Sequence, residues 1–334
     1  MQVSCCGEAA FLLECPSSLI SKMLPAMKRR DFLGLTTLAA GTLALNPMTG
    51  STLAEAADVP ALDIPWIQLT KEVKAPRIGF GTGMNGAMRR SDMIRGGYPK
   101  ALEMIHYAYD RGIRLFDCAD LYGTHDVVKT ALSGKPRDSY VLVSKLWLLP
   151  GGIPEKERLD PAETVDRFLW ELGTDYIDVL QIHCMQNDGW TRQFENAMES
   201  MAKLKKAGKI RAHGISTHSN AAAELGAQTD WCDAVHVRIN NQGMHMDGPQ
   251  NDPAARVAET IRAAKKVHDA GKGVIAMKVL GQGDMKDPEM RKKATKFIAD
   301  LDCISTILVG FTEKEQISEF LTNFAEVQAG VQKG

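Results

Sequence analysis

The chain has 334 residues, of which 44% are hydrophobic and 24% are charged, and its formal net charge is −1. This composition is typical of a globular protein, and a chain with no basic surplus and no long run of one sign gives no indication of a nucleic-acid-binding surface. The length permits two domains, but a single α/β barrel also has this size.

The N-terminal segment has the pattern of an export signal. The pair Arg29-Arg30 precedes an uncharged, mildly apolar run at 35–45 and a small-x-small site at 54–56. This order and spacing indicate a twin-arginine signal, although a chance arginine pair before an apolar stretch is the alternative. The apolar run is too short to act as a stable membrane anchor.

The signal divides the chain into two parts. Because export signals are read near the start of a chain, we expect translation to begin at Met27 and cleavage to follow Ala56. Residues 1–56 would then be the signal with an upstream segment, and residues 57–334 one barrel domain. The expected partner is the twin-arginine export machinery, and the expected location is the periplasm.

Four cysteines follow the signal, namely Cys118, Cys184, Cys232 and Cys303. They are widely spaced and form no C-x-x-C motif, so the sequence indicates neither a zinc site nor an iron–sulfur cluster, and no metal is expected. Each lies in an apolar stretch, and we expect free, buried thiols.

From residue 77 onward, apolar strands alternate with amphipathic helices. Strands are predicted at 77–81, 113–119, 140–146, 177–183, 210–216, 234–239, 274–280 and 304–309. Helices are predicted at 101–110, 125–132, 161–172, 194–207, 220–225, 254–270, 289–300 and 313–324. Continuously apolar strands are typical of parallel sheets buried on both faces, and eight strand–helix units predict a single-domain (β/α)8 TIM barrel.

The alternative is an open, doubly wound α/β sheet. Such sheets bind dinucleotides through a G-x-G-x-x-G turn after the first strand. Here Gly79, Gly81 and Gly83 alternate instead, which disfavours that fold.

Ionisable residues follow three neighbouring predicted strands. Asp117 ends the second strand and Tyr122 follows it; Lys145 and His183 end the third and fourth. Each residue alone is more often structural: a packed tyrosine, a lysine reaching water, or a satisfied core histidine. Because active sites of such barrels lie at the carboxyl ends of the strands, their coincidence favours a catalytic site.

The four side chains suit proton transfer to a carbonyl. A phenol has a pKa of about 10, and a nearby ammonium favours the phenolate, so we expect Lys145 to lower the pKa of Tyr122. Asp117 would hold Lys145 charged, and His183 would hydrogen-bond a substrate oxygen. Tyr122 would be the general acid. Since no side chain delivers hydride, a nicotinamide cofactor is expected.

From Arg77 to Phe324 the chain resembles the aldo/keto reductase family. The resemblance rests on the motifs FGTG at 80–83, DCADLYG at 117–123, VSKLW at 143–147, LQIHC at 180–184, GIS at 214–216 and ILVGFTEKEQISEF at 307–320. It implies a TIM barrel, a catalytic tetrad of Asp117, Tyr122, Lys145 and His183, NADP or NAD as cofactor, and a small carbonyl or alcohol as substrate.

The resemblance also implies a set of cofactor-binding positions. These are Gly81, Thr82, Gly83, Ser216, Thr217, His236, Met277, Lys278, Leu280, Gly281, Gly310, Phe311, Thr312, Gln316 and Glu319.

Several of these positions depart from the family pattern. Thr217 stands where relatives carry Asn, His236 where they carry Gln, and Met277 where they carry a stacking Tyr. Phe311 and Gln316 stand where a Ser and an Arg hold the 2′-phosphate of NADPH. Glu319 matches an acidic residue near the adenine. Lys314 offers a point charge without the fork of an arginine, so the choice between NADP and NAD stays open.

Residues expected to face the substrate are Met84, Trp147 and Trp190, each after a different strand. Aromatic side chains at a barrel mouth often line a pocket, although Trp190 could instead pack its own loop. The loop at 241–252, with Met244 and Met246, either covers the site or is ordinary surface.

Three functions are compatible with these residues. The first is an exported NAD(P)-dependent reductase or dehydrogenase of carbonyls and alcohols. The second is an enzyme with tightly bound, recycled NAD(P) acting on a sugar, which export favours. The third is a non-catalytic subunit that keeps the cofactor as a ligand, which the complete tetrad disfavours.

Overall fold

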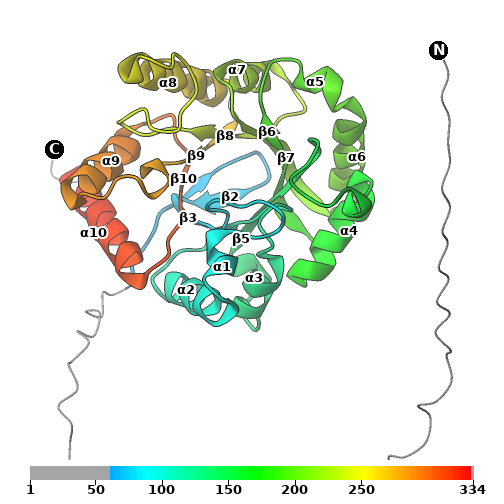
Figure 1. The fold of residues 1–334 in the computed structure, drawn as a ribbon, viewed down its shortest axis with the longest axis horizontal. Helices are drawn as coiled ribbons and strands as arrows, with labels where there is room; N and C mark the ends of the chain where they lie inside the picture. Colours follow the sequence, from blue (N-terminus) through cyan, green and yellow to red (C-terminus); the bar gives the residue numbers. More distant parts are fainter. Residues whose placement is uncertain (1–60, 332–334) are drawn as a thin grey trace, which may run out of the picture. The chain divides into compact units, whose positions relative to one another are not determined.

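In the computed structural model, which describes residues 61–331, eight parallel strands form a closed barrel in the order β10-β3-β4-β5-β6-β7-β8-β9 (Figure 1). The expected export signal lies outside these residues. The strands are β3 (Ile78–Gly81), β4 (Leu115–Asp117), β5 (Val141–Leu146), β6 (Ile177–Met185), β7 (Ile210–Thr217), β8 (Ala234–Arg238), β9 (Gly273–Met277) and β10 (Thr306–Val309). The predicted (β/α)8 barrel is thereby confirmed.

Helices surround the barrel on all sides in Figure 1. The helices that alternate with the strands are α2 (Tyr98–Asp110), α3 (His125–Ala131), α4 (Pro161–Leu172), α6 (Glu195–Lys206), α7 (Asn220–Gln228), α8 (Pro253–Asp269), α9 (Pro288–Asp300) and α10 (Lys314–Val331). Two single-turn helices, α1 (Asp92–Arg95) and α5 (Trp190–Gln193), lie in the loops.

Local sequence explains why α4 lies where it was predicted. Asp160 accepts a hydrogen bond from the backbone N–H of Ala162 at 2.8 Å, and Pro161 occupies the first helical position. Gly173 ends the helix in a left-handed conformation with φ of 63°. An acceptor before the first turn, a proline in it and a glycine after the last turn are the usual boundaries of a helix.

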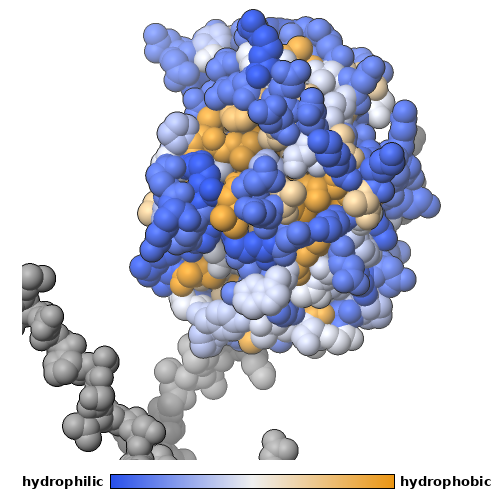
Figure 2. Space-filling view, turned by 90° about the vertical axis from the view of Figure 1, so that its right-hand side faces the viewer, coloured by the Kyte–Doolittle hydropathy of each residue, from blue (hydrophilic) through white to orange (hydrophobic). Residues whose placement is uncertain are grey.

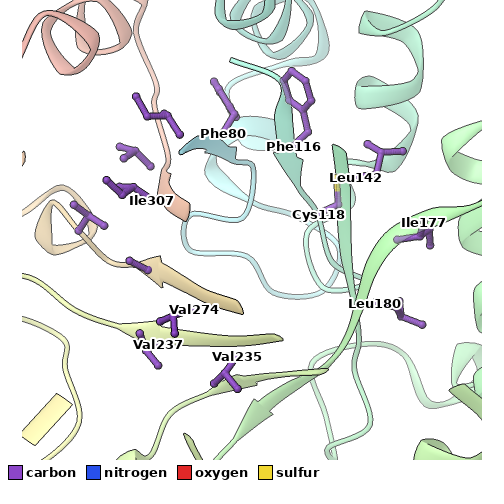
Figure 3. Packing of buried hydrophobic residues seen from close by; sticks show 14 of the residues in the cluster. Phe80, Phe116, Cys118, Leu142, Ile177, Leu180, Val235, Val237, Val274 and Ile307 are labelled. Atoms are coloured by element: carbon purple, nitrogen blue, oxygen red, sulfur yellow. The ribbon is translucent and has the colours of Figure 1, made fainter. Parts of the chain in front are cut away.

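Most of the apolar core lies between the barrel and the helices. Side chains such as Phe80, Phe116, Leu142, Leu180 and Ile307 are buried there and point away from the barrel axis toward the helices (Figure 3). The free thiols of Cys118, Cys184, Cys232 and Cys303 are buried, as expected.

A second, smaller core fills the interior of the barrel. Leu115, Val143, Val179 and Ile275 contribute to it from the strands. An antiparallel hairpin of β1 (Trp66–Gln68) and β2 (Lys74–Pro76) adds Leu69, Val73 and Ala75. This hairpin was not predicted from the sequence. It packs on the amino ends of the strands, as the contact of Leu69 with Gly273 at the start of β9 shows, and leaves the opposite end of the barrel for the site.

Two element boundaries differ from the prediction in ways that affect the site. Strand β9 ends at Met277 and not at residue 280, because Lys278 adopts a left-handed conformation with φ of 61°. Helix α10 continues beyond Phe324 to Val331.

One side of the barrel is largely hydrophilic. The side of the barrel seen in Figure 2 shows mostly polar residues with small hydrophobic patches between them. Within residues 61–331, none of the helices combines the length and the apolarity that a membrane crossing needs.

Candidate active site

The alternation of side chains along the strands carries polar residues into the barrel. Leu115 and Val143 belong to the interior core, so Asp117 and Lys145, each two residues later, also point inward. The pairing of Asp117 with Val143 between β4 and β5 sets the two strands in register. The sequence therefore places a carboxylate and an ammonium on adjacent strands at one end of the barrel.

Asp117 and Lys145 form a buried ion pair. The ammonium of Lys145 donates to Asp117 Oδ1 and, at 3.0 Å, to the carbonyl of Cys118, and its side chain is 1% exposed. His236 Nε2 lies 3.4 Å from Asp117 Oδ1. Burial alone would raise the pKa of Asp117, but Lys145 and His236 together hold it below its usual value. The pair is therefore charged and fixed in position.

Tyr122 lies on the loop after β4, with its ring against the backbone of the loop after β3. A Cβ atom at Gly83 or Gly86 would overlap the Tyr122 ring, so both positions require glycine. The Lys145 Nζ atom is 5.1 Å from the ring centre, and the Tyr122 hydroxyl is 3.5 Å from His183 Nε2. The four expected catalytic side chains thus lie together.

The expected lowering of the pKa of Tyr122 is wrong for this structure. Burial, followed by the nearby charge of Asp117, raises the pKa of Tyr122 well above its usual value. The ammonium of Lys145 is paired with Asp117 and lies 5.1 Å from the ring centre, so its attraction for the phenolate does not offset the effects of burial and of Asp117. The proton therefore stays on Tyr122 at neutral pH.

His183 is a neutral imidazole at the same end of the barrel. Burial and the positive charge of Lys145 lower its pKa well below 6.5. Its Nδ1 atom is buried without a hydrogen-bond partner. A neutral imidazole with an unused ring nitrogen can donate or accept one further hydrogen bond.

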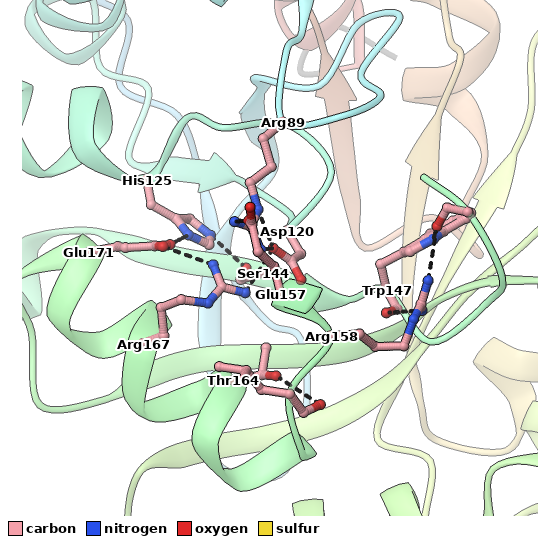
Figure 4. Close-up of polar contacts among 12 residues, drawn as sticks. Arg89, Asp120, His125, Ser144, Trp147, Glu157, Arg158, Thr164, Arg167 and Glu171 are labelled. Atoms are coloured by element: carbon pink, nitrogen blue, oxygen red, sulfur yellow. Dashed lines mark hydrogen bonds and ion pairs between the residues drawn. The ribbon is translucent and has the colours of Figure 1, made fainter. Parts of the chain in front are cut away.

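The three residues expected to face the substrate lie in different environments. Trp147 meets His183 edge-on, with ring centres 5.3 Å apart, and its Nε1–H donates to the Gly151 carbonyl at 2.5 Å. Arg158 donates hydrogen bonds to the backbone carbonyls of Trp147 and Gly151 and thereby fixes this loop (Figure 4). Met84 lines the cleft described below.

The placement of Trp190 at the mouth is wrong. Its side chain is 1% exposed and packs in the core beside Trp231, and its Nε1–H donates to the Ala222 carbonyl at 3.3 Å. The short helix α5 directs the indole inward, so Trp190 packs its own segment.

Two cavities run from Tyr122 toward helix α10. The smaller, of about 110 Å³, is lined by Asp117, Tyr122, Met277 and Lys278, among others. The larger, of about 470 Å³, reaches the start of α10. Both are lined by Met84, Leu280, Gln282, Gly283 and Gly310. They therefore form one elongated cleft, large enough for a ligand of several hundred Å³.

The expected cofactor positions divide into two groups. Gly81, Gly83, Met277, Lys278, Leu280, Gly310, Phe311, Thr312, Gln316 and Glu319 line the cleft. Thr82, Ser216, Thr217, His236 and Gly281 are not among the residues that line either cavity.

The hydroxyls in the second group are already engaged. Thr82 donates to the Asp117 carbonyl at 2.8 Å, and Thr217 donates to the His236 carbonyl at 3.0 Å. Ser216 accepts from the backbone N–H of Cys184 at 2.9 Å. These side chains connect neighbouring strands, and the expectation that they contact a cofactor stays a prediction. His236 is fully buried with its Nε2 atom facing Asp117, and its Nδ1 atom lacks a hydrogen-bond partner.

Several residues of the cleft were missed from the sequence. Asn85 and Gln282, both with left-handed backbones, hydrogen-bond to each other across it. Arg291 lines the larger cavity and pairs with Glu319. The run Gly281-Gln282-Gly283 after β9 was the available signal, because adjacent glycines mark a tight turn at a strand end.

The loop at 241–252 packs beside the cleft. Asp247 pairs with Arg238 at the end of β8, and His245 Nε2 lies 2.7 Å from Asp284 Oδ2. Met246 is buried. The loop therefore supports the segment after β9, which forms one wall of the cleft.

A second ionic cluster, called the enclosed cluster, lies between helices α3 and α4 and the loops after β3 and β4 (Figure 4). Asp120 Oδ1 accepts from Arg167 at 2.8 Å and from Arg89 at 3.1 Å. Glu171 pairs with Arg167 and with His125 at 2.6 Å. Burial would raise the pKa of Glu171, but His125 and Arg167 lower it to about 2. None of these five residues lines the cleft.

The model of one protein family, described as the aldo/keto reductase family, matches residues 77–326. Two curated relatives are the aldo-keto reductase YhdN of Bacillus subtilis, 34% identical over 160 residues, and the methylglyoxal reductase YeaE of Escherichia coli, 30% identical over 158 residues. These matches cover 44% and 45% of this chain and 45% and 48% of the relatives. The chain thus spans about half the length of the curated relatives it matches.

Solved structures share the fold at lower sequence identity. The aldo-keto reductase AKR11C1 of Bacillus halodurans, in its holo form, is 19% identical with a TM-score of 0.59, over 81% of this chain and 96% of that one. An aldo-keto reductase of Klebsiella pneumoniae in complex with NADPH is 17% identical with a TM-score of 0.56, over 81% of this chain and 95% of that one. At this identity the likeness concerns the fold alone.

Proposed function

Because this chain belongs to the aldo/keto reductase family, we propose that it is an NAD(P)-dependent oxidoreductase that interconverts a small carbonyl compound and its alcohol. The observation that carries the proposal is a proton-bearing Tyr122 that lies beside the Asp117–Lys145 pair and His183 and lines the end of an elongated cleft. A relative named as a methylglyoxal reductase supports a small aldehyde or ketone as the substrate.

The residues of the cleft fit a dinucleotide. The cleft extends from Tyr122 to the start of α10, and Gly81, Gly83 and Gly310 line it. Lys278 lines its inner part and would face the diphosphate. A bound reduced nicotinamide would supply hydride to the carbonyl carbon.

The side chains of the site hold the proton and control its transfer to the substrate. The raised pKa of Tyr122 keeps the phenol protonated until a carbonyl oxygen gains charge. Neutral His183 hydrogen-bonds the same oxygen and orients it. When the proton leaves Tyr122, the ammonium of Lys145, held by Asp117, stabilises the negative phenolate. Burial strengthens each of these interactions.

The direct test measures binding and turnover together. We expect the purified protein to hold or bind NAD(H) or NADP(H) and, with the reduced form, to reduce an activated aldehyde such as para-nitrobenzaldehyde. Loss of the absorbance of the reduced nicotinamide reports the reaction. A protein that binds neither dinucleotide at millimolar concentration refutes the proposal. Binding without turnover of a panel of aldehydes, ketones and sugars would favour the non-catalytic subunit.

We also propose that the protein is exported by the twin-arginine route, on the sequence of residues 27–56. That route carries folded proteins, which suits a barrel loaded with its cofactor before export. Replacing Arg29-Arg30 by Lys-Lys should retain the protein in the cytoplasm. Unchanged periplasmic recovery of this variant in fractionated cells would contradict the proposal.

A further inference from the structure

We infer that the cleft is built for a dinucleotide without a 2′-phosphate, so that NAD(H) binds more tightly than NADP(H), and that Gln316 and Glu319 set this preference. The inference rests on the proposed function and specifies its cofactor. The 2′-phosphate that distinguishes NADP lies on the adenosine, the end of the molecule remote from the nicotinamide. With the nicotinamide at Tyr122, the adenosine would occupy the larger cavity beside α10.

The backbone donors at the start of α10 are already occupied. Gln316 Oε1 accepts hydrogen bonds from the N–H groups of Thr312 at 2.8 Å and Glu313 at 3.2 Å, and from the Thr312 hydroxyl at 3.3 Å. Free N–H groups at a helix start are the usual binding site for a phosphate. Here the carboxamide of Gln316 takes that place, and a phosphate would have to displace it.

The guanidinium of Arg291, which lines the larger cavity, is also already paired. Arg291 donates from Nε and Nη2 to the two carboxylate oxygens of Glu319 at 2.7 and 2.8 Å. Its Nη1 donates to the carbonyls of Met285 and Lys286 at 3.2 and 2.5 Å. A bidentate pair of this kind neutralises the arginine and fixes its fork away from other anions.

The remaining charges give a phosphate little support. Among the described residues that line this cavity, Lys286 is the cation without a carboxylate partner, and it is exposed to solvent, which screens it. The lysine at the start of α10, Lys314, pairs with Glu103 on α2. A phosphate with a charge of about −2 would therefore enter beside Glu319 and Asp284 without a fixed counter-charge.

Lys278 does not alter this conclusion. It lines the smaller cavity together with Tyr122, and its ammonium donates to Gln282 Oε1. At that position it contacts the part of a dinucleotide that NAD and NADP share. Its charge raises the affinity for both without separating them.

The test compares the equilibrium binding of NADH and NADPH by tryptophan fluorescence or calorimetry, independent of any substrate. In low salt of about 0.05 M we expect NADH to bind at least about 10-fold more tightly, with a smaller ratio in about 0.5 M salt because repulsion is screened. Equal or tighter binding of NADPH in low salt overturns the inference and leaves the proposed function standing. Failure to bind either dinucleotide refutes both.

Two variants test whether Gln316 and Glu319 cause the preference for NADH over NADPH. Gln316→Arg frees the two N–H groups and adds a fork, so NADPH affinity should rise about 10-fold while NADH affinity changes less than about 3-fold. Glu319→Gln, which releases Arg291, should give a smaller rise. Glu326→Gln is the matched control, because Glu326 is on the same helix and pairs with Lys292 away from the cleft. Unchanged NADPH affinity in folded Gln316→Arg protein removes Gln316 from this role.

Discussion

The carboxyl ends of β4 and β5 lead into two buried ionic clusters with different roles. The proposed catalytic cluster, called the catalytic cluster below, consists of the ion pair of Asp117 and Lys145 and of two neutral groups beside it, Tyr122 and His183. Tyr122 lines the cleft. In the enclosed cluster, Asp120 lies between Arg89 and Arg167 (Figure 4). None of the three lines the cleft.

The comparison shows that a buried charge does not by itself mark an active site. Asp117 and Asp120 are three residues apart in the sequence, and both are nearly fully buried. The enclosed cluster ends in opposite charges, which suits the fixing of loops. The catalytic cluster reaches the cleft through Asp117 and Tyr122, which suits chemistry.

The largest effect is expected for Lys145→Met. The variant leaves the buried carboxylate of Asp117 without its cation, which should cost about 3–5 kcal/mol of unfolding free energy and abolish turnover. Urea denaturation and aldehyde reduction measure the two effects. Adding Asp117→Asn should restore part of the stability and none of the activity. Recovery of activity in the double variant would contradict the role of the ammonium.

Asp120→Asn should separate the two clusters. It removes the counter-charge of Arg89 and Arg167, both of which are partly exposed, so we expect a loss of about 2 kcal/mol in stability. Turnover by protein that remains folded should stay within about 3-fold. Asp166→Asn, at a surface pair with Lys209, is the control and should change little. A loss of turnover without a loss of stability would place Asp120 in the catalytic cluster.

The two clusters should also lose stability in different pH ranges. Burial lowers the pKa of His183 well below 6.5. His218 directly follows β7 and lies close enough to act on His183, and burial, followed by the charges of Arg238 and Lys278, lowers its pKa to about 4. The unfolded chain then binds more protons, so the unfolding free energy falls as the pH drops from about 6.5 to about 4. Glu171, with its pKa lowered from 4.5 to about 2, adds a further loss between these values.

Urea denaturation at a series of pH values measures this dependence. His218→Gln should flatten the upper part of the curve and Glu171→Gln the lower part. If each variant changed the opposite range, the assignment of the pKa shifts to the two clusters would be wrong.

The smallest effect is expected for Trp147→Phe. The ring contact with His183 is largely kept, but the hydrogen bond to the Gly151 carbonyl is lost. We expect KM for the aldehyde to rise about 3-fold to 10-fold with kcat nearly unchanged, as for a residue that contacts the substrate equally throughout the reaction. Trp170→Phe, on the exposed side of α4, is the control. An equal fall in kcat would show that Trp147 acts in the chemical step.

The sequence predicted the barrel and the gathering of the four expected catalytic side chains at one end of it, because both depend on simple periodic patterns. Apolar runs separated by glycines and prolines set the order of strands and helices. The alternation of side chains then placed Asp117, Lys145 and His183 inside the barrel. The hairpin of β1 and β2 escaped because its strands have only three residues each.

The remaining differences depend on packing that the sequence does not reveal. Sequence shows which charges are near Tyr122 but not how deeply the phenol is buried, and burial decides the direction of its pKa. The hydroxyls of Ser216 and Thr217 could point to a ligand or to a neighbouring strand, and in the structure each forms a hydrogen bond with a neighbouring strand. Arg291 meets Glu319 only because α9 and α10 lie side by side.

The measurement that tests the central claim most directly is the single-turnover rate of aldehyde reduction by Tyr122→Phe protein loaded with the reduced dinucleotide. The variant keeps the ring against Gly83 and removes only the transferable proton. We expect the rate to fall about 10²-fold to 10⁴-fold with unchanged dinucleotide affinity. A single-turnover rate equal to that of the wild type would show that Tyr122 is not the proton donor and that the catalytic cluster has been misassigned.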